Sequence, residues 1–267
     1  MLDLKNEKFD IVIQGGQSNA DGSGIGDVEV AYVPTEKVYY LNSEKTVDTL
    51  EDGLKIEFFD KPFQFEIANY RYADDKVIGD LSLTFSEEYI KRGCLKDGRK
   101  LLIIRAAIGG TGFFKKHWGL QDMLYLKMLE MTDFALKLNP ENKVVAFLWH
   151  QGEHDAFEGN PADVYYTQLN DMLSDVRERY GEIPFIAGDF ANEWKSLNIE
   201  ICEPIIQTIK DVVGNNDRCA FVETSDLLSN NQKTGNGDNI HFCRESLHEL
   251  GRRYFSEYFK IIQKSNI

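Results

Sequence analysis

The sequence has no apolar run approaching the ~20 residues that a membrane-spanning helix needs. Positive charge is also scarce, because 30 Lys and Arg residues stand against 44 Asp and Glu residues, for a net charge of −14. This balance argues against nucleic acid or an anionic membrane as a partner. The four cysteines form no CxxC pair, which favours buried free thiols over disulfides or a zinc site.

The chain also lacks the apolar segment of a signal peptide. Its start, MLDLKNEKFD, is charged from Asp3 onward. As sequenced, the protein is therefore expected to be cytoplasmic. A secreted form whose leader has been removed is the alternative.

Short apolar runs alternate with segments of helical periodicity. Runs of this kind predict strands at 9–14, 100–107, 143–150, 183–190 and 218–224. They are apolar almost throughout, which is typical of parallel strands covered on both faces. Helices are expected at 81–91, 121–138, 161–180, 199–213 and 244–263. The alternation predicts an α/β fold, a three-layer α/β/α sandwich with a central parallel sheet.

Residues 27–80 interrupt this rhythm. They show no clear strand-helix unit, so we expect an irregular insertion with one short strand near 38–41. Its aromatic residues are favoured as local core, although such side chains can also contact sugars: Tyr39, Tyr40, Phe58, Phe59 and Phe63. No linker or internal repeat is visible, and a single domain over 1–267 is predicted.

Glycine and polar residues follow three successive predicted strands. The segments after these strands are Gly15–Asn19, Ile108–Gly112 and His150–Glu153. In open parallel sheets, ligands bind beyond the carboxyl ends of the strands. These segments are therefore expected to share one rim, which makes the rim the candidate site.

A serine hydroxyl at this rim needs a base. Ser18 is a poor nucleophile unless a neighbour accepts its proton. Among the five histidines, His241 is preceded three residues earlier by Asp238, which can hold its Nδ1–H and leave Nε2 for the serine. The other candidates, His117, His154 and His248, lie among charged residues and are expected to be solvated.

An attacking serine also needs donors for the oxyanion that it generates. The backbone N–H groups of Ser18 and of Gly110 (or Gly109), with the side-chain NH₂ of Gln151, could supply three. Together these groups predict an esterase site.

The segment WHQGEHDA (149–156) also contains H-x-x-E-H, the spacing of one class of zinc peptidase. A zinc hydrolase would use His150 and His154, but only if both lay on one face of a helix. His150 ends a predicted strand and Gly152 lies between the two, which disfavours a metal site. A glycosidase that pairs Glu153 with Asp155 or Asp189 is a further alternative.

Four ordered blocks resemble those of the SGNH hydrolase superfamily. The blocks are GGQSNADG (15–22), RAAIGGTGF (105–113), WHQGEHDA (149–156) and DNIHFCRESLHELGRRY (238–254). They are most similar to the sialate O-acetylesterase-like and carbohydrate esterase family 6 acetylesterases. Two positions depart from that pattern: Ala20 stands where methionine is usual, and His154-Asp155 where many members have Ser-Asp.

The resemblance implies a flavodoxin-like fold, with Ser18 as nucleophile, His241 as base and Asp238 as its orienting partner. It also implies an oxyanion hole of Ser18, Gly109 or Gly110, and Gln151. Supporting positions are expected at Gln17, Asn19, Thr111 and Glu153. The predicted function is removal of O-acetyl groups from a carbohydrate without a metal or organic cofactor. A non-catalytic carbohydrate-binding protein of the same fold is the alternative.

Overall fold

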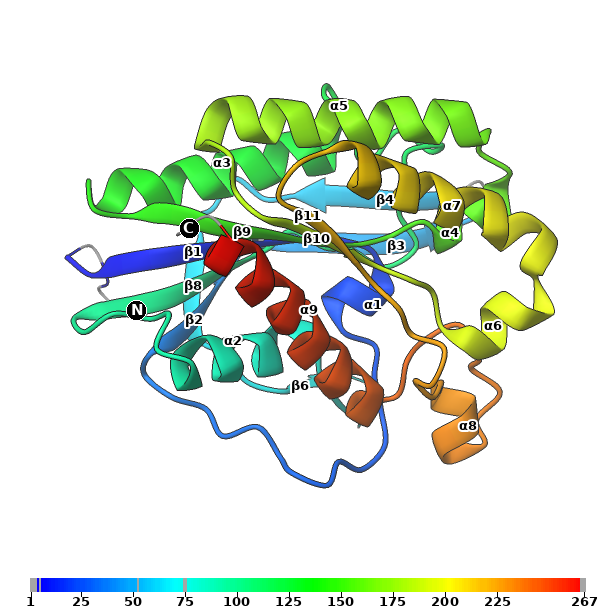
Figure 1. The fold of residues 1–267 in the computed structure, drawn as a ribbon, viewed down its shortest axis with the longest axis horizontal. Helices are drawn as coiled ribbons and strands as arrows, with labels where there is room; N and C mark the ends of the chain where they lie inside the picture. Colours follow the sequence, from blue (N-terminus) through cyan, green and yellow to red (C-terminus); the bar gives the residue numbers. More distant parts are fainter. Residues whose placement is uncertain (1–3, 5, 52, 74–75, 265–267) are drawn as a thin grey trace.

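A seven-stranded sheet forms the centre of the molecule (Figure 1). The computed structural model describes residues 4, 6–51, 53–73 and 76–264. In spatial order the strands are β11 (Cys219–Val222), β10 (Phe185–Gly188), β9 (Lys143–His150), β1 (Lys8–Gly16), β8 (Arg99–Arg105), β2 (Val38–Asn42) and β5 (Gln64–Ile67). All neighbouring strands are parallel except β2 and β5, which pair antiparallel.

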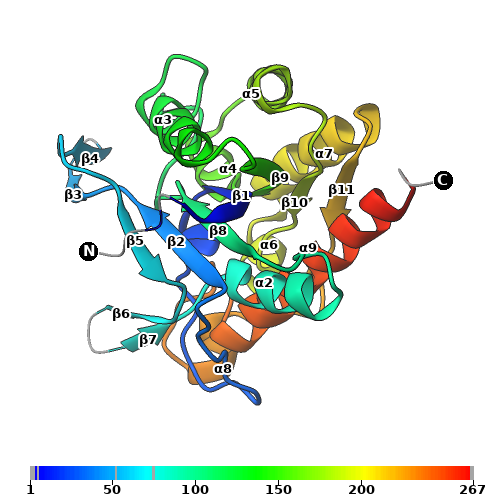
Figure 2. The same ribbon diagram turned by 90° about the vertical axis from the view of Figure 1, so that its left-hand side faces the viewer.

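Helices cover both faces of this sheet (Figure 2). One face carries α3 (Met123–Leu138), α5 (Ala162–Tyr180) and α7 (Ile199–Asn215), and the other carries α2 (Leu81–Lys91) and α9 (Arg244–Lys264). The predicted three-layer α/β/α sandwich is confirmed, and each predicted long helix and core strand is present within a few residues of its expected bounds.

The core lies in the two layers between sheet and helices. Alternate residues of β1 serve opposite layers: Ile13 packs in the cluster beneath α3 and α5, and Val12 in the cluster beneath α2 and α9. Both are fully buried, which is why the predicted run is apolar without alternation. Each such side chain contributes about 1.5–3 kcal/mol on burial. All four cysteines are free, and Cys202 and Cys243 are buried.

The insertion at 27–80 is more regular than the sequence predicted. Besides β2, which was expected, it contains β5 in the main sheet and two separate hairpins. These hairpins are β3 (Lys45–Leu50) with β4 (Gly53–Phe58), and β6 (Arg71–Ala73) with β7 (Lys76–Ile78). The prediction of an irregular segment with one strand was therefore wrong. The aromatic residues of this segment differ in exposure: Tyr39 and Tyr40 are buried, whereas Phe59 is exposed.

The chain changes direction across the sheet beside β1. From β1 it first builds β2 and β8 on one side, then crosses to β9 on the other. The crevice at such a switch point is where ligands bind in open α/β sheets. Four short helices gather near this carboxyl end (Figure 1): α1 (Ser18–Asp21), α4 (Glu153–Glu158), α6 (Asn192–Leu197) and α8 (Asn230–Thr234). Within the described residues, no helix is both long and apolar enough to cross a membrane.

Candidate active site

A tight turn after β1 presents Ser18 at the first position of α1. The turn depends on Gly16, which has φ +126° and lies so close to β9 that an added Cβ would be 2.1 Å from the His150 carbonyl oxygen. The backbone N–H of Gln17 donates to that same oxygen at 3.0 Å. Only glycine permits this approach, because both its backbone angles and the missing Cβ are required.

Ser18 meets a histidine from a distant part of the chain. The His241 Nε2 lies 2.9 Å from Ser18 Oγ, and His241 Nδ1 lies 2.9 Å from both carboxylate oxygens of Asp238. Burial works against ionisation of Asp238, but hydrogen bonds from His241 and Asn230 lower its pKa below the ordinary value. An ionised Asp238 accepts the Nδ1–H and leaves the Nε2 lone pair directed at the serine hydroxyl.

Asn19 connects the serine turn to the loop that carries His241. Its Nδ2 donates to Glu153 Oε1 at 2.8 Å and to the Ile240 carbonyl at 3.1 Å, and its Oδ1 accepts from Phe242 N at 3.1 Å. Asn19 is fully buried, so water cannot replace these bonds. The loop residues on either side of His241 are thereby held against α1.

Glu153 and His150 are buried behind the candidate site, where they hydrogen-bond to Asn19 and Tyr254, respectively. Both are shielded from solvent, and burial raises the pKa of Glu153 while lowering that of His150 to about 3. Tyr254 donates to the Trp149 carbonyl at 2.9 Å, so it accepts the proton of His150 Nδ1, also at 2.9 Å. His150 ends β9 and His154 lies in α4, so the two are not on one helical face. No group of three or more metal-ligating side chains occurs within the described residues.

The second glycine segment lies against the serine. A Cβ added to Gly109 would be 3.3 Å from Ser18 Cβ, and Gly110 has the left-handed φ of +71°. Within the described chain, the backbone N–H groups of Ser18, Gly109 and Gly110 have no protein acceptor. Thr111 is buried, donates to the Ile108 carbonyl at 2.7 Å and accepts from Trp118 Nε1 at 3.0 Å. Thr111 thus fixes this turn.

The amide of Gln151 is already fully hydrogen-bonded. Its Nε2 lies 2.5 Å from Asp155 Oδ2, 3.2 Å from the Thr111 carbonyl and 3.3 Å from Gln17 Oε1, and its Oε1 accepts from Tyr165 at 3.0 Å. An NH₂ group has only two hydrogens, so none is left for an oxyanion. The expected orientation of this NH₂ toward Ser18 is therefore not what the structure has.

Asp155 has a supporting role that the sequence did not predict, since it was considered there only as a glycosidase carboxylate. It is fully buried and accepts from the backbone N–H groups of Phe113 and Phe114 at 3.0 and 2.8 Å, and from Asn160 at 2.8 Å, in addition to Gln151. It ties the Gly-Gly turn to the start of α4. Because these four donors occupy both oxygens of its carboxylate, Asp155 is not available as a glycosidase acid or base.

Gln17 presents the amide hydrogens that Gln151 does not. Its Oε1 accepts from the backbone N–H of His154 at 3.1 Å, which fixes the orientation of the amide. Gln17 Nε2 then has no hydrogen-bond partner within the described residues, and Gln17 lines the cavity above Ser18. No signal in the sequence distinguished the two glutamines, because the difference arises from which backbone groups lie beside each.

The cavity above Ser18 has a volume of about 570 Å³. Its wall includes Gly109, Gly110 and His241 with the apolar side chains of Leu54, Phe157 and Trp194. Phe157 is largely exposed at the edge of this cavity.

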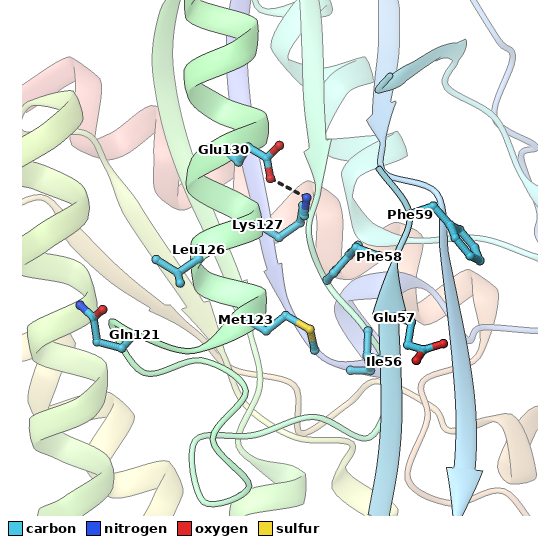
Figure 3. A pocket seen from close by; sticks show the side chains of 9 residues that line it. All are labelled: Ile56, Glu57, Phe58, Phe59, Gln121, Met123, Leu126, Lys127 and Glu130. Atoms are coloured by element: carbon cyan, nitrogen blue, oxygen red, sulfur yellow. Dashed lines mark hydrogen bonds and ion pairs between the residues drawn. The ribbon is translucent and has the colours of Figure 1, made fainter. Parts of the chain in front are cut away.

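A larger cavity, of about 740 Å³, lies between β4 and α3 (Figure 3). Its lysine, Lys127, pairs with one of its two glutamates, Glu130, at 2.5 Å. None of the predicted site residues lines it, so the smaller cavity above Ser18 is the candidate active site.

Two histidines differ from their predicted solvated state. His117 and His248 are 9% and 2% exposed. His248 packs parallel to Tyr70 and lies 3.1 Å from its hydroxyl, and burial lowers the His248 pKa to about 4. Both lie in locally charged sequence, but their side chains point inward.

The three-layer α/β/α fold, with its central parallel sheet, is that of the SGNH hydrolases. The chain matches the model of one family, described as "Carbohydrate esterase, sialic acid-specific acetylesterase", over residues 8–260. It therefore belongs to this family and is a carbohydrate acetylesterase, a carboxylic ester hydrolase. The non-catalytic alternative is thereby set aside.

Solved structures agree on the fold. NanS has 17% identity and a TM-score of 0.72, with 97% of this chain and 98% of that chain covered. An Arabidopsis thaliana protein has 18% identity and a TM-score of 0.67, with 94% and 98% covered. A carbohydrate acetylesterase from Xanthomonas citri has 17% identity and a TM-score of 0.61, with 94% and 56% covered. Curated protein sequences gave no match.

Proposed function

We propose that this protein is a serine esterase that removes O-acetyl groups from a carbohydrate through an acetyl-enzyme. The observation that carries the proposal is the chain of 2.9 Å contacts from Ser18 Oγ through His241 to Asp238, which opens on the 570 Å³ cavity. Membership of the acetylesterase family supports the acetyl ester as substrate.

The reaction proceeds in two acyl transfers. Ser18 Oγ attacks the acetyl carbonyl carbon while His241 Nε2 takes the hydroxyl proton. The tetrahedral intermediate collapses, the bond to the sugar oxygen breaks, and His241 returns the proton to that oxygen. Water then attacks the acetyl-Ser18 ester while His241 takes one of its protons. The bond to Ser18 Oγ breaks, His241 returns the proton to that oxygen, and acetic acid leaves and ionises to acetate. Asp238 keeps its charge throughout and stabilises the imidazolium form of His241.

The negative oxygen of each intermediate requires preorganised donors. We assign this function to the backbone N–H groups of Ser18 and of Gly109 or Gly110, which have no other acceptor among the described residues. As the third donor we propose Gln17 Nε2, in place of the Gln151 amide expected from the sequence. Gln151 instead positions Gln17, by donating to Gln17 Oε1.

Replacement of Gln17 tests its assignment as an oxyanion donor. Gln17→Met keeps the length of the side chain and removes both amide hydrogens. It is expected to lower kcat about 100-fold or more with little change in KM, because an oxyanion donor acts in the transition state. Steady-state kinetics on an acetyl ester measure this. A Gln17→Met enzyme with wild-type kcat would exclude Gln17 as a donor.

The carbohydrate itself is tested by acetate release. A panel of acetylated saccharides, including O-acetylated sialic acid because of the family description, is incubated with the wild-type enzyme. A fluorophosphonate reagent, which modifies activated serines, is expected to label the peptide that contains Ser18 and to abolish acetate release. Release of acetate from no member of the panel, or labelling at another serine, would contradict the proposed function.

Chelation tests the zinc hypothesis for His150 and His154. Acetate release is expected to be the same before and after dialysis against EDTA, because no step above uses a metal. His150 is buried and bonded to Tyr254, which leaves it poorly placed as a ligand. Loss of activity on chelation and its return with zinc would revive the metal site.

A further inference from the structure

A second, smaller cavity of about 280 Å³ adjoins the catalytic one. The two share four wall residues: Thr49, Leu54, Gly110 and His154. Beyond these, the smaller cavity is lined by Gly53 and by the polar side chains of Lys115, His117 and Glu158. We call this space the side cavity. Because Gly110 belongs to both walls, the side cavity begins beside the oxyanion position.

His117 offers the side cavity an unpartnered donor. The side chain is more than nine-tenths buried, and its Nδ1 accepts the backbone N–H of Gly112 at 3.1 Å. Burial, with a smaller effect from His154, lowers the His117 pKa and favours the neutral ring. The single proton of that ring is then on Nε2, which has no partner within the described residues. Because His117 lines the side cavity, a ligand bound there can supply the acceptor.

Lys115 and Glu158 add a donor and an acceptor that are held together. Their Nζ and Oε2 atoms are 3.0 Å apart, and both side chains remain partly exposed. The two charges cancel, so the pair does not favour an anion or a cation. A hydroxyl group, which donates and accepts at once, can bond to both partners.

We propose that the side cavity binds hydroxyl groups of the saccharide whose acetyl ester lies at Ser18. This rests on the proposed function. The acetyl methyl needs little space, so the part of the substrate that extends beyond the ester is the alcohol portion, the sugar. A mixed set of neutral, donor and acceptor groups suits a polyhydroxylated ligand, and its volume lies near the low end of the ~300–1,000 Å³ of small-molecule sites.

The experiment compares two substrates, 4-nitrophenyl acetate and an acetylated saccharide. Glu158→Gln and Lys115→Met are expected to raise KM for the saccharide about tenfold, the effect of losing about 1.4 kcal/mol of binding. Neither variant should change kcat/KM for the aryl ester, which has no hydroxyl groups to place there. His117→Gln, which retains a donor, is expected to have the smallest effect.

Lys127→Met is the matched control, because it breaks the similar Lys127–Glu130 pair of the larger cavity (Figure 3). It should alter neither substrate. Unchanged saccharide KM in both Glu158→Gln and Lys115→Met would overturn the proposal. An equal loss on both substrates would also overturn it, since that would indicate damage to the catalytic geometry.

A binding measurement keeps this proposal separate from the catalytic one. Titration of the deacetylated saccharide into Ser18→Ala protein, with and without Glu158→Gln, reports occupancy without chemistry. Weaker binding in the double variant supports the side cavity even if Ser18 proves not to be the nucleophile. Equal binding counts against the side cavity, whatever the esterase assays show.

Discussion

Ser18→Ala is expected to lower kcat for an acetyl ester by at least about 10⁴-fold. Ser18 Oγ is the only protein atom that our mechanism bonds to the acetyl carbon, and alanine offers no atom for that bond. His241 would still lie beside the cavity and could activate water directly, which sets the residual rate. Acetate release under saturating substrate is the measurement.

The control for Ser18→Ala is Ser174→Ala. Ser174 lies in α5 and donates only to the Asn170 carbonyl of its own helix. Both variants should show the thermal unfolding midpoint of the wild type within a few degrees. A folded Ser18→Ala protein with near-wild-type activity would remove Ser18 from the mechanism and, with it, the acetyl-enzyme.

The sequence predicted the layered fold well because parallel strands that are buried on both faces have continuous apolar runs, which are easy to recognise. β8 and β9 contain unbroken runs of buried apolar residues at 101–104 and 145–149, and β1 is buried from Phe9 onward. The β3–β4 hairpin has no such apolar run. Most residues of β3 are exposed, so no apolar alternation marks it as a strand. Its Thr49 and Leu54 nevertheless reach the candidate site.

The sequence also placed the right segments together but could not orient their amides. Parallel topology alone brings the ends of β1, β8 and β9 to one edge, which explains why Ser18, Gly109 and Gln151 are neighbours. Which glutamine has free amide hydrogens depends on Asp155 and on the His154 N–H. These groups are brought beside the glutamines by α4, which starts three residues after β9 ends. No spacing in the sequence predicts these supporting contacts.

Asp238→Asn is the other change with a large expected effect, a fall in kcat of about 10⁴-fold. In the wild type, Asp238 accepts from His241 Nδ1, from the His241 backbone N–H at 3.3 Å and from Asn230 Nδ2 at 2.9 Å. Every neighbour of this carboxylate is thus a donor. The NH₂ group of an asparagine must face one of these donors. If His241 Nδ1 accepts a hydrogen bond from that NH₂, the single proton of the neutral ring is on Nε2 instead. Nε2 would then direct a hydrogen at Ser18 Oγ and could not take the hydroxyl proton.

The unfolding midpoint distinguishes this effect from simple misfolding. Asparagine has nearly the same shape as aspartate, and Asp238 is only partly buried, so the fold can accommodate it. The unfolding midpoint of Asp238→Asn should therefore change little while kcat falls. Asp171→Asn, an exposed carboxylate of α5, is the matched control and should leave both rate and midpoint unchanged. If Asp238→Asn retained the wild-type rate, His241 would not need its carboxylate partner, and the base would have to be oriented by the backbone alone.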